Sequence, residues 1–528
     1  MIYALKLLVA ALIAWGGARA LCRRPFAELL PAGAYRHAWL LVVLATIAAY
    51  LCKFPALFFG VFAGIAIYGR ASCSNQSVAA ISVYLVLAVV VPPITFGLGG
   101  VGDINSLLVL DQYRLLALVV LAPAALRLVS RNRALEPGGI QALDVCLVAY
   151  LVLRIVLRIP YSTTTNVLRM TVESLLDTFL PYYVLTRSIR TLANLRFAVG
   201  YLAIGLLFAG SVAVVECLLQ HNIYSGLQAV YDLVWSLTYQ LARGGLVRVQ
   251  AMTQTPILLA AAMVFMTGLW IWLKGADWRQ GGFRLVFAFI LVALAGSGSR
   301  GPWLACGALF LVLLMLRWLS PRTVRVLLLL GVVAAIAIKA AGADEAVFST
   351  LSLLFGGTGQ DMSTIDYRRQ LLNDSLALIK QSPWLGVPNY ASKLQDLRQG
   401  EGIIDIVNTY IAILLSAGVV GLTLFLLPYL IVIHRALGAI RHDEAGKVSR
   451  GSRFAVAFVA MNIAFLIMIF TSSTFGILQM LMLLLFALPA AWLRLSEQER
   501  ESIPAPFADE AARPRAVADY TVARSRGA

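Results

Sequence analysis

The sequence predicts an all-α polytopic membrane protein with about 12–15 transmembrane helices and two large extracytoplasmic loops. The first observation is composition: 60% of the 528 residues are hydrophobic and 13% are charged, with a mean hydropathy of +0.83. A soluble domain carries about a quarter charged residues. The second is a series of long apolar runs, and the third is the placement of Lys and Arg in the short loops between them.

The apolar runs follow one another along the whole chain, and each is a candidate for a helix that crosses the bilayer. Lys53 and Pro55 separate the second run from the third, and Gly296 to Pro302 interrupts the stretch 284–318. Backbone breaks at membrane depth are tolerated only where protein or a water-filled cavity covers them. The runs are 2–18, 38–52, 55–69, 78–97, 113–128, 140–158, 172–186, 197–218, 255–273, 284–296, 302–318, 323–341, 406–434, 454–472 and 476–493.

The distribution of Lys and Arg predicts which loops face the cytoplasm, because short cytoplasmic loops carry most basic residues. The formal net charge of +17 is therefore mainly a matter of topology, and we expect no nucleic-acid partner. Loops 219–254 and 342–405 are assigned to the opposite side, since long loops cross the membrane largely regardless of charge. The basic short loops are 19–36, 70–77, 127–139, 187–196, 274–284, 317–325 and 435–453.

This pattern predicts a multi-pass protein of the inner (cytoplasmic) membrane, with membrane lipids around it and both long loops on the periplasmic or extracytoplasmic face. Residues 1–169 are expected to form N-terminal transmembrane helices, and 170–493 a second membrane domain that contains both long loops. The Pro-, Ala-, Arg- and Glu-rich tail 494–528 is expected to be disordered and cytoplasmic. The six cysteines include no CxxC pair, so they indicate neither a disulfide framework nor a zinc site.

Four charged residues lie within predicted spans. Arg154 and Arg158 share one helix face, and Glu173 and Asp177 share a face of the next run. An antiparallel hairpin that turns near residues 164–165 would pair Arg158 with Glu173 and Arg154 with Asp177. Charges inside a membrane are costly and usually paired. The sequence therefore favours ion pairs that stabilise the fold, and the alternative is a polar wall of a substrate or ion path.

Four short motifs lie in or beside the outer loops. Arg248 precedes Pro256 by eight residues at the entrance of a span, and Ser299-Arg300-Gly301 lies at the break of the hairpin 284–318. Arg368 precedes an amphipathic stretch that ends before Pro383-x-x-Gly386. Asn408 is followed by nine residues, 409–417, and then by Gly418-x-x-Gly421.

In this order the motifs resemble the O-antigen ligase and polysaccharide polymerase (Wzy-like) superfamily of integral membrane glycosyltransferases, over roughly residues 170–490. The resemblance implies a GT-C-like arrangement of helices and a glycan donor carried on a polyprenyl diphosphate. The sequence departs from the family pattern at three positions: Val407 replaces the family His before the Asn, Thr255 replaces a His before the entrance Pro, and Pro388 replaces a Gly. Because ligases of the family depend on the first His, Val407 favours polymerisation over ligation.

The chemistry of this transfer assigns roles to the motif residues. A leaving diphosphate gains negative charge that a fixed guanidinium can stabilise, so Arg248 and Arg300 are the candidate catalytic arginines. Asp405 is the candidate base for the acceptor hydroxyl, although it could instead cap a helix; Asp366, Glu401 and His221 are alternatives. The candidate substrate-binding residues are Arg368, Arg243, Asn408 and Ser299. No metal-ligand cluster is visible, so metal-independent transfer without a cofactor is expected.

Two other functions remain open from the sequence. The protein could be a transporter or flippase of lipid-linked saccharides, which the four intramembrane charges favour, or a catalytically degenerate scaffold of a polysaccharide assembly complex, which Val407 favours. Against a transporter, the motif arginines lie in the outer loops, whereas a carrier usually keeps its polar site near the midplane. A lipid-linked oligosaccharide is the expected partner, with a flippase and a chain-length regulator as further partners in O-antigen or exopolysaccharide biosynthesis.

Overall fold

The computed structural model describes residues 2–27, 29–99, 106–130, 141–229, 231, 241–243, 245–274, 281–318, 359–397, 404, 406–442 and 448–501. This part of the chain is almost entirely helical, which confirms the all-α polytopic fold. The predicted run 323–341, most of loop 342–405 before residue 359, and the tail beyond residue 501 lie outside the described residues.

The first half of the chain forms helices over most of the predicted apolar runs, and one helix, 164–174, begins before the predicted run 172–186. π-Helical turns at Ala117–Leu121 and Leu175–Phe179 join α5 to α6 and α8 to α9, so each pair is continuous. The helices are α1 (Ile2–Phe26), α2 (Ala32–Leu51), α3 (Pro55–Ser72), α4 (Ala79–Ala88), α5 (Gln112–Leu116), α6 (Ala122–Ser130), α7 (Gln141–Val156), α8 (Thr164–Ser174), α9 (Leu180–Ser188) and α10 (Leu192–Leu219).

The second half contains the broken hairpin, the helices of the second long loop and the last long helices. The break predicted between the runs 284–296 and 302–318 is present, because α13 ends at Gly296 and α14 begins at Arg300. The helices are α12 (Pro256–Lys274), α13 (Gly281–Gly296), α14 (Arg300–Met315), α17 (Gly359–Gln381), α18 (Tyr390–Lys393), α19 (Thr409–Gly438), α20 (Arg453–Met468), α21 (Gly476–Leu493) and α22 (Glu497–Glu501).

Within the described residues, 8 helices are long and apolar enough to cross a membrane. Four further apolar helices are shorter, with 10–17 residues: Ala79–Ala88, Gly282–Gly296, Arg300–Met315 and Arg453–Met468. The predicted run 78–97 is helical only to Ala88, because Pro92 and Pro93 lack the N–H groups that a helix needs. The chain turns at residues 89–90 and then becomes extended, and it is buried as far as Ile94, which a packed membrane protein tolerates.

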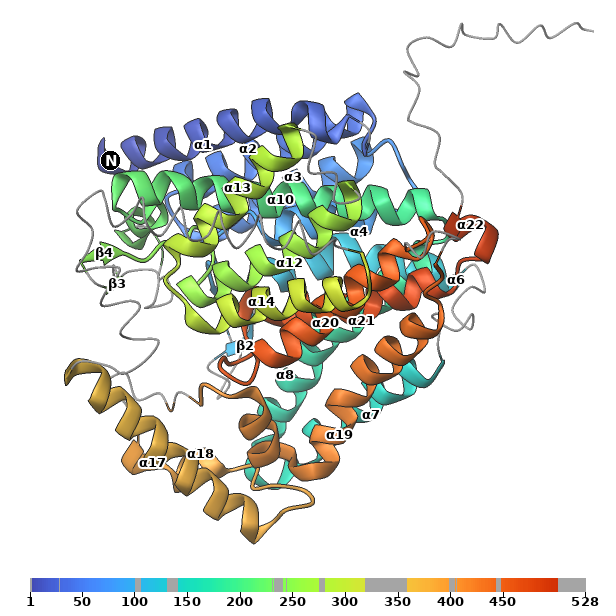
Figure 1. Ribbon diagram of the computed structural model, residues 1–528. Helices are drawn as coiled ribbons and strands as arrows, with labels where there is room; N and C mark the ends of the chain where they lie inside the picture. Colours follow the sequence, from blue (N-terminus) through green and yellow to red (C-terminus); the bar gives the residue numbers. More distant parts are fainter. Residues whose placement is uncertain are drawn as a thin grey trace, which may run out of the picture.

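The long helices lie side by side and define two ends of the bundle (Figure 1). We name the end where α10 finishes and α12 begins the loop end, and the end where α1 finishes and α10 begins the basic end. Basic residues fill the last turns of helices that finish at the basic end: Arg23 and Arg24 in α1, Lys274 in α12 and Arg435 in α19. These three helices therefore finish with their basic residues at the same end of the bundle.

Two small antiparallel hairpins add strands that the sequence did not suggest. β1 (Phe96–Gly99) pairs with β2 (Ser106–Leu110), and β3 (Ala242–Arg243) pairs with β4 (Leu246–Val247). The second hairpin lies at the loop end, directly before Arg248 (Figure 1). Both hairpins belong to connections between helices, so the helical architecture is unchanged.

The predicted ion pairs of Arg158 with Glu173 and of Arg154 with Asp177 are wrong. Arg114, near the start of α5, donates from Nη1 to Glu173 Oε1 at 2.8 Å and from Nη2 to Asp177 Oδ2 at 3.0 Å. The guanidinium of Arg154 lies instead over the ring of Tyr150, 5.7 Å from its centroid. One arginine fork reaches both carboxylates because α5 packs against the π-helical turn that joins α8 to α9.

Candidate active site

Arg248 lies on the break between α13 and α14. Its Nε donates to the carbonyl of Ser297 at 2.8 Å, and its Nη2 donates to Ser299 Oγ at 2.9 Å. The neighbouring backbone is joined too, since Val249 N donates to Gly296 O at 3.1 Å. A guanidinium forms such fixed, two-point contacts more readily than an ammonium group. Two motifs that are about 50 residues apart in sequence therefore form one structure.

Glu216, in the last turn of α10, holds the backbone that presents Arg248. Its carboxylate is fully buried and accepts hydrogen bonds from three backbone N–H groups: Ile223 at 2.9 Å, Gln250 at 3.0 Å and Ala251 at 2.8 Å. Ala251 adopts the left-handed conformation, with φ +48°, which a non-glycine residue rarely does. Through these bonds Glu216 ties both residue 223 and residues 250–251 to the end of α10.

Ser299, Arg300 and Gly301 begin α14. The Ser299 hydroxyl does not cap the helix but accepts from Arg248, while Arg300 is the first helical residue and its side chain is exposed. Gly301 lies against the segment that follows α20, where a Cβ atom would collide with Thr471 Oγ1. Only glycine allows this approach, so the motif brings the start of α14 to Thr471.

The segment after α20 joins the start of α14 to the start of α19. Thr409 donates from its N–H to Ile469 O at 3.0 Å and from its hydroxyl to Ser472 O at 2.7 Å. The Ser473 hydroxyl donates to Ile406 O at 2.7 Å. Asn408 precedes Thr409 and caps α19. The segment after α20 therefore contacts Gly301 and also the residues that flank Asn408.

The Pro-x-x-Gly and Gly-x-x-Gly motifs contact each other directly. Gly418, with φ +61° and ψ −164°, kinks α19, and the turn of Pro383 to Gly386 docks into the kink. Val419 N donates to Pro383 O at 2.9 Å, and Val420 N donates to Trp384 O at 3.1 Å. A third hydrogen bond crosses the same contact, because Val387 N donates to Leu415 O of α19 at 2.6 Å.

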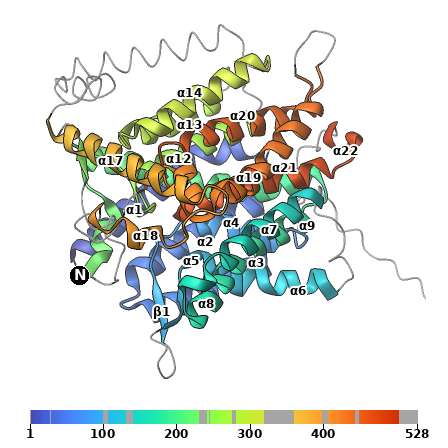
Figure 2. The ribbon, with the colours of Figure 1, turned by 90° about the horizontal axis from the view of Figure 1, so that it is seen from below.

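Both glycines of this contact are required by its closeness. A Cβ atom at Gly386 would lie 2.6 Å from Leu415 O, and one at Gly418 would collide with the Trp384 carbonyl. The contact fastens α17 and α18 to the first turns of α19, as the view from below shows (Figure 2). A small apolar core under α17 supports the same arrangement, formed by Leu371, Leu378, Leu394, Leu397, Ile406 and Leu415. These two motifs thus act as a backbone lock between the second long loop and a membrane helix.

Residues 285–426 match the family model described as O-antigen ligase. This segment is similar to the O-antigen ligase family. No curated protein matches the chain significantly. The matched segment extends from α13 to the kinked part of α19 and contains Arg300, the Pro383 to Gly386 turn and Gly418. Arg248 lies outside it and joins it through the contacts with Ser297 and Ser299.

The structure assembles some of the predicted site residues and leaves others without a described position. Arg248, Ser299 and Arg300 lie together, and Asn408 is joined to them through the segment after α20. The Asn408 carboxamide oxygen accepts from Tyr410 N at 3.0 Å and Ile411 N at 3.2 Å, as a helix cap does. Asp405 and Glu401 lie outside the described residues, as do the side chains of Asp366, Arg368 and Arg243.

The alternative base His221 and the departure Val407 are both described. His221 follows α10, and its Nε2 lies 3.3 Å from Ser225 Oγ, while its backbone N donates to Glu216 O at 3.4 Å. Val407 is half-buried directly before the Asn408 cap. Its isopropyl group can neither accept nor transfer a proton, so the position that carries a family His offers no base in this chain.

The sequence analysis did not identify Glu216 or the hydroxyl residues Thr471, Ser472 and Ser473, which hold the backbone of the site in place. The signal for Glu216 is a lone acidic residue near the end of an otherwise apolar run of about 20 residues. The signal for the second is Thr471-Ser472-Ser473-Thr474, four hydroxyl residues in a row between two apolar spans. Hydroxyl side chains of this kind satisfy backbone groups where helices end.

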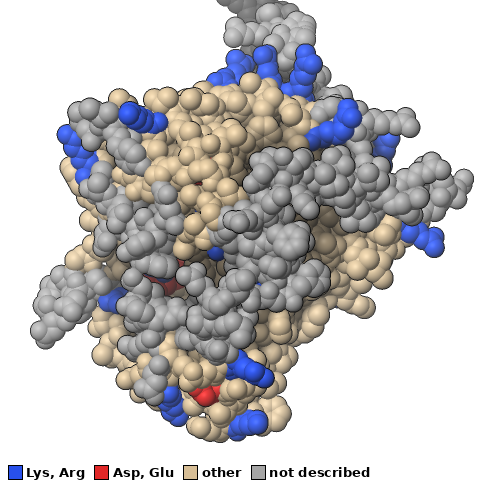
Figure 3. Space-filling model, turned by 60° about the vertical axis from the view of Figure 1, so that its left-hand side comes forward, with Lys and Arg blue, Asp and Glu red and all other residues tan. Residues whose placement is uncertain are grey.

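The face at the loop end shows where charge lies around the site (Figure 3). Most described Lys and Arg side chains visible in this view stand around the edge of the face. A few basic and acidic atoms are also visible nearer the middle of the face. Among the described residues, no group of three or more His, Cys, Asp or Glu side chains could hold a metal ion.

Proposed function

We propose that the protein is a membrane glycosyltransferase that polymerises, or ligates, an oligosaccharide carried on a polyprenyl diphosphate. The observation that carries the proposal is the binding of Arg248 across the Ser297 to Ser299 break, beside Arg300 and the start of α14. The O-antigen ligase family of residues 285–426 supports the same chemistry. The surface product would be an O-antigen or an exopolysaccharide.

The reaction needs a fixed positive environment for the leaving diphosphate. The first N–H groups of a helix and its dipole attract phosphate oxygens, and α14 begins at this point. Arg248 and Arg300 would add guanidinium groups that stay charged at every physiological pH. Because hydrogen bonds to Ser297 and Ser299 hold Arg248 in place, little reorganisation would be needed as charge develops.

The acceptor hydroxyl needs a group that removes its proton. We propose Asp405 for this role, because it stands two residues before the position where the family carries a His. Asn408, Arg368 and Arg243 would bind sugar or phosphate oxygens. Val407 removes the group on which family ligases depend, so we favour polymerisation of lipid-linked repeats. We further propose metal-independent transfer at the periplasmic face of the inner membrane, with a flippase and a chain-length regulator as partners.

Complementation of a gene deletion tests the proposal. The deletion strain should accumulate lipid-linked single repeats on the outer face and lose long polymer, because repeats are exported but not joined. Arg248→Ala and Arg300→Ala should fail to restore polymer at normal protein level. Arg284→Ala is the matched control, since Arg284 is exposed on α13, the helix that precedes the break.

Two outcomes would contradict the proposal. Restoration of long polymer by both Arg248→Ala and Arg300→Ala would show that the arginines do not support catalysis. Accumulation of the lipid-linked repeat on the cytoplasmic face would instead indicate a flippase. A scaffold would be indicated if the double variant restored polymer while deletion of the whole chain did not.

A further inference from the structure

Two arginines lie close together at the basic end of a group of four packed helices. In this group α12 contacts both α10 and α20, and α21 contacts the other three. Arg196 lies in the second turn of α10, and Arg453 is the first residue of α20. Both helices begin at the basic end, on the right of the bundle in Figure 1. The two side chains are near enough for their positive charges to repel each other.

Aromatic contacts fix the position of Arg453. The next residue, Phe454, meets the ring of Trp272 edge-on with centroids 4.8 Å apart and stacks on Trp492 with centroids 5.3 Å apart. All three rings are buried, and the two tryptophans lie in the last turns of α12 and α21. The start of α20 is therefore held against two neighbouring helices, and Arg453 cannot move far from Arg196 without breaking these contacts.

The described part of the protein does not neutralise either arginine. The ion pairs between described residues are formed by Arg114 and Arg187, and neither Arg196 nor Arg453 forms one. Arg453 Nε is buried without a hydrogen-bond partner, and Arg450 adds a further repelling charge. A partly buried cation is costly unless it is paired, because water can solvate it only in part. A bound anion would remove this cost.

The place of Arg453 in its helix favours an anion as well. The N-terminus of a helix is the positive end of its dipole, so it stabilises anions and destabilises cations. Arg453 stands at the first position of α20, and the side chain of Ser452 does not cap the helix. A cation at this position is the reverse of the usual arrangement. An anion between Arg196 and Arg453 would be attracted by both guanidinium groups and by the start of α20.

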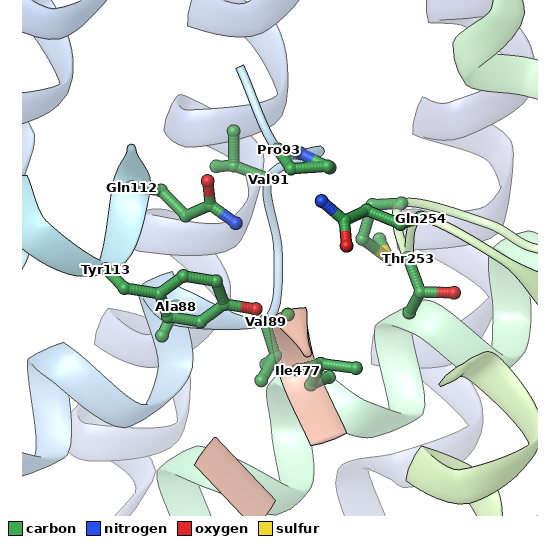
Figure 4. A pocket seen from close by; sticks show the side chains of 11 residues that line it. Ala88, Val89, Val91, Pro93, Gln112, Tyr113, Thr253, Gln254 and Ile477 are labelled. Atoms are coloured by element: carbon green, nitrogen blue, oxygen red, sulfur yellow. The ribbon is translucent and has the colours of Figure 1, made fainter. Parts of the chain in front are cut away.

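Uncompensated charge distinguishes this place from the hollow that lies between the residues after α4 and the starts of α5, α12 and α21. That hollow is lined by Gln112, Thr253, Gln254 and mainly apolar residues, and no charged residue is among them (Figure 4). Nothing in its lining would select an ionic ligand. The two arginines at the basic end do provide such a selection, since their charge is fixed and their partner is missing from the described residues.

The chemistry and the depth of the two arginines indicate which anion would bind. A planar guanidinium matches phosphate oxygens in two-point contacts. Arg196 and Arg453 are only partly exposed and lie in the first two turns of apolar helices. The phosphates of a bilayer lie at this level, and basic pockets between transmembrane helices bind anionic lipid headgroups. A lipid phosphate therefore fits the place better than a phosphate dissolved in water.

We propose that Arg196 and Arg453 form a binding site for the phosphate of an anionic membrane lipid at the basic end. Arg450 is exposed nearby and would attract the headgroup over a longer distance. The bound lipid would tie α10 to α20 and so stabilise the bundle. This site is independent of glycosyl transfer at the loop end, and its test does not depend on that function.

Thermal unfolding of the purified full-length protein in detergent, titrated with phosphatidylglycerol, tests the site. A ligand that binds only the folded state raises the melting temperature. Phosphatidylglycerol should act on the wild type at lower concentrations than phosphatidylcholine with the same acyl chains, because choline neutralises the phosphate. Arg196→Gln and Arg453→Gln should each raise the half-saturating concentration of phosphatidylglycerol about tenfold or more, since a hydrogen bond from a charged group is lost.

Arg435→Gln is the matched control, because Arg435 is exposed in the last turn of α19 at the same end. It should change the half-saturating concentration by less than about twofold, as a surface charge does. Without lipid, Arg196→Gln and Arg453→Gln should unfold at or above the wild-type melting temperature, because each removes one of two repelling charges. If either unfolds earlier, substitution by Lys replaces it, since Lys keeps the charge and loses the two-point contact.

Three results would overturn the proposal. The first is an equal effect of phosphatidylglycerol and phosphatidylcholine on the wild-type protein. The second is an equal loss of phosphatidylglycerol binding in Arg435→Gln and in the two site variants, which would indicate diffuse attraction by the basic end. The third is saturation by inorganic phosphate at the same concentration as phosphatidylglycerol, which would indicate a site for soluble phosphate.

Discussion

Replacement of Gly418 by alanine tests the backbone lock between the second long loop and α19. Gly418 has φ +61° and ψ −164°, a region that is almost restricted to glycine and costs other residues about 1–3 kcal/mol. The added Cβ would also collide with the Trp384 carbonyl and lie 2.5 Å from Leu385 N. Both contacts are with backbone, which cannot rotate away as a side chain can.

The collision can be relieved only if the turn of Pro383 to Gly386 moves away from α19, and this sets the expected loss of stability at the contact. Three hydrogen bonds cross the contact, from Val419 N, Val420 N and Val387 N, and each contributes about 0.5–1.5 kcal/mol. Together with the backbone strain, about 3 kcal/mol or more is lost locally. Since each 1.36 kcal/mol is a factor of ten, opening of the contact should become about 100-fold more frequent.

Hydrogen–deuterium exchange measures this opening directly. Peptides that contain Val387, Val419 and Val420 should exchange about 100-fold faster in Gly418→Ala than in the wild-type protein. Gly438→Ala, at the other end of the same helix, is the control, because a Cβ there meets nothing within 4 Å. The reasoning is refuted if Gly418→Ala exchanges at these amides within about threefold of the control.

Two further predictions concern the charged cluster at the start of α5. Arg114→Met should destabilise the protein by about 3–5 kcal/mol, because it leaves Glu173 and Asp177 without their cation. Unfolding in denaturant measures this loss, and Arg154→Met should show a much smaller one. Equal losses for the two variants would contradict the observed pairing. The pKa of Asp111 is raised to about 6, mainly by burial and also by nearby Asp177, while the Arg114 N–H and guanidinium oppose the rise. Because this pKa lies above the usual value of about 4, the folded state holds the proton more tightly, and the stabilisation present at low pH is lost as pH rises through about 6. The melting temperature of the wild type should therefore fall relative to Asp111→Asn between pH 4 and pH 7; a constant difference would argue against the shift.

Much of the helical framework could be predicted because hydropathy is a local property of the chain. The split at Lys53 and Pro55, and the break at Gly296 to Pro302, appear where the sequence interrupts its apolar runs. The ion pairs could not be predicted in this way. Spacing places Arg154 opposite Asp177 in an ideal hairpin, but Arg114 reaches both acidic residues from a helix that is about 60 residues away in sequence.

The same division holds for the candidate site. The motifs could be recognised singly, because each is a short pattern of glycine, proline and arginine. The contacts between the motifs could not be predicted. Glu216 accepts from backbone N–H groups, and because nearly every residue has such a group, no sequence pattern shows which residues it contacts. Thr471 and Ser473 likewise act on the neighbours that packing gives them.

The sequence by itself determined that this is a polytopic helical membrane protein, that its apolar runs are interrupted at Lys53 to Pro55 and at Gly296 to Pro302, and which motifs resemble the O-antigen ligase family. Only the tertiary structure decided that Arg248 rests on the Ser297 to Ser299 break and that the turn of Pro383 to Gly386 docks into the kink at Gly418. The physical reason is range. Hydropathy and backbone preference act over a few residues, whereas a hydrogen bond depends on which helices lie side by side after packing.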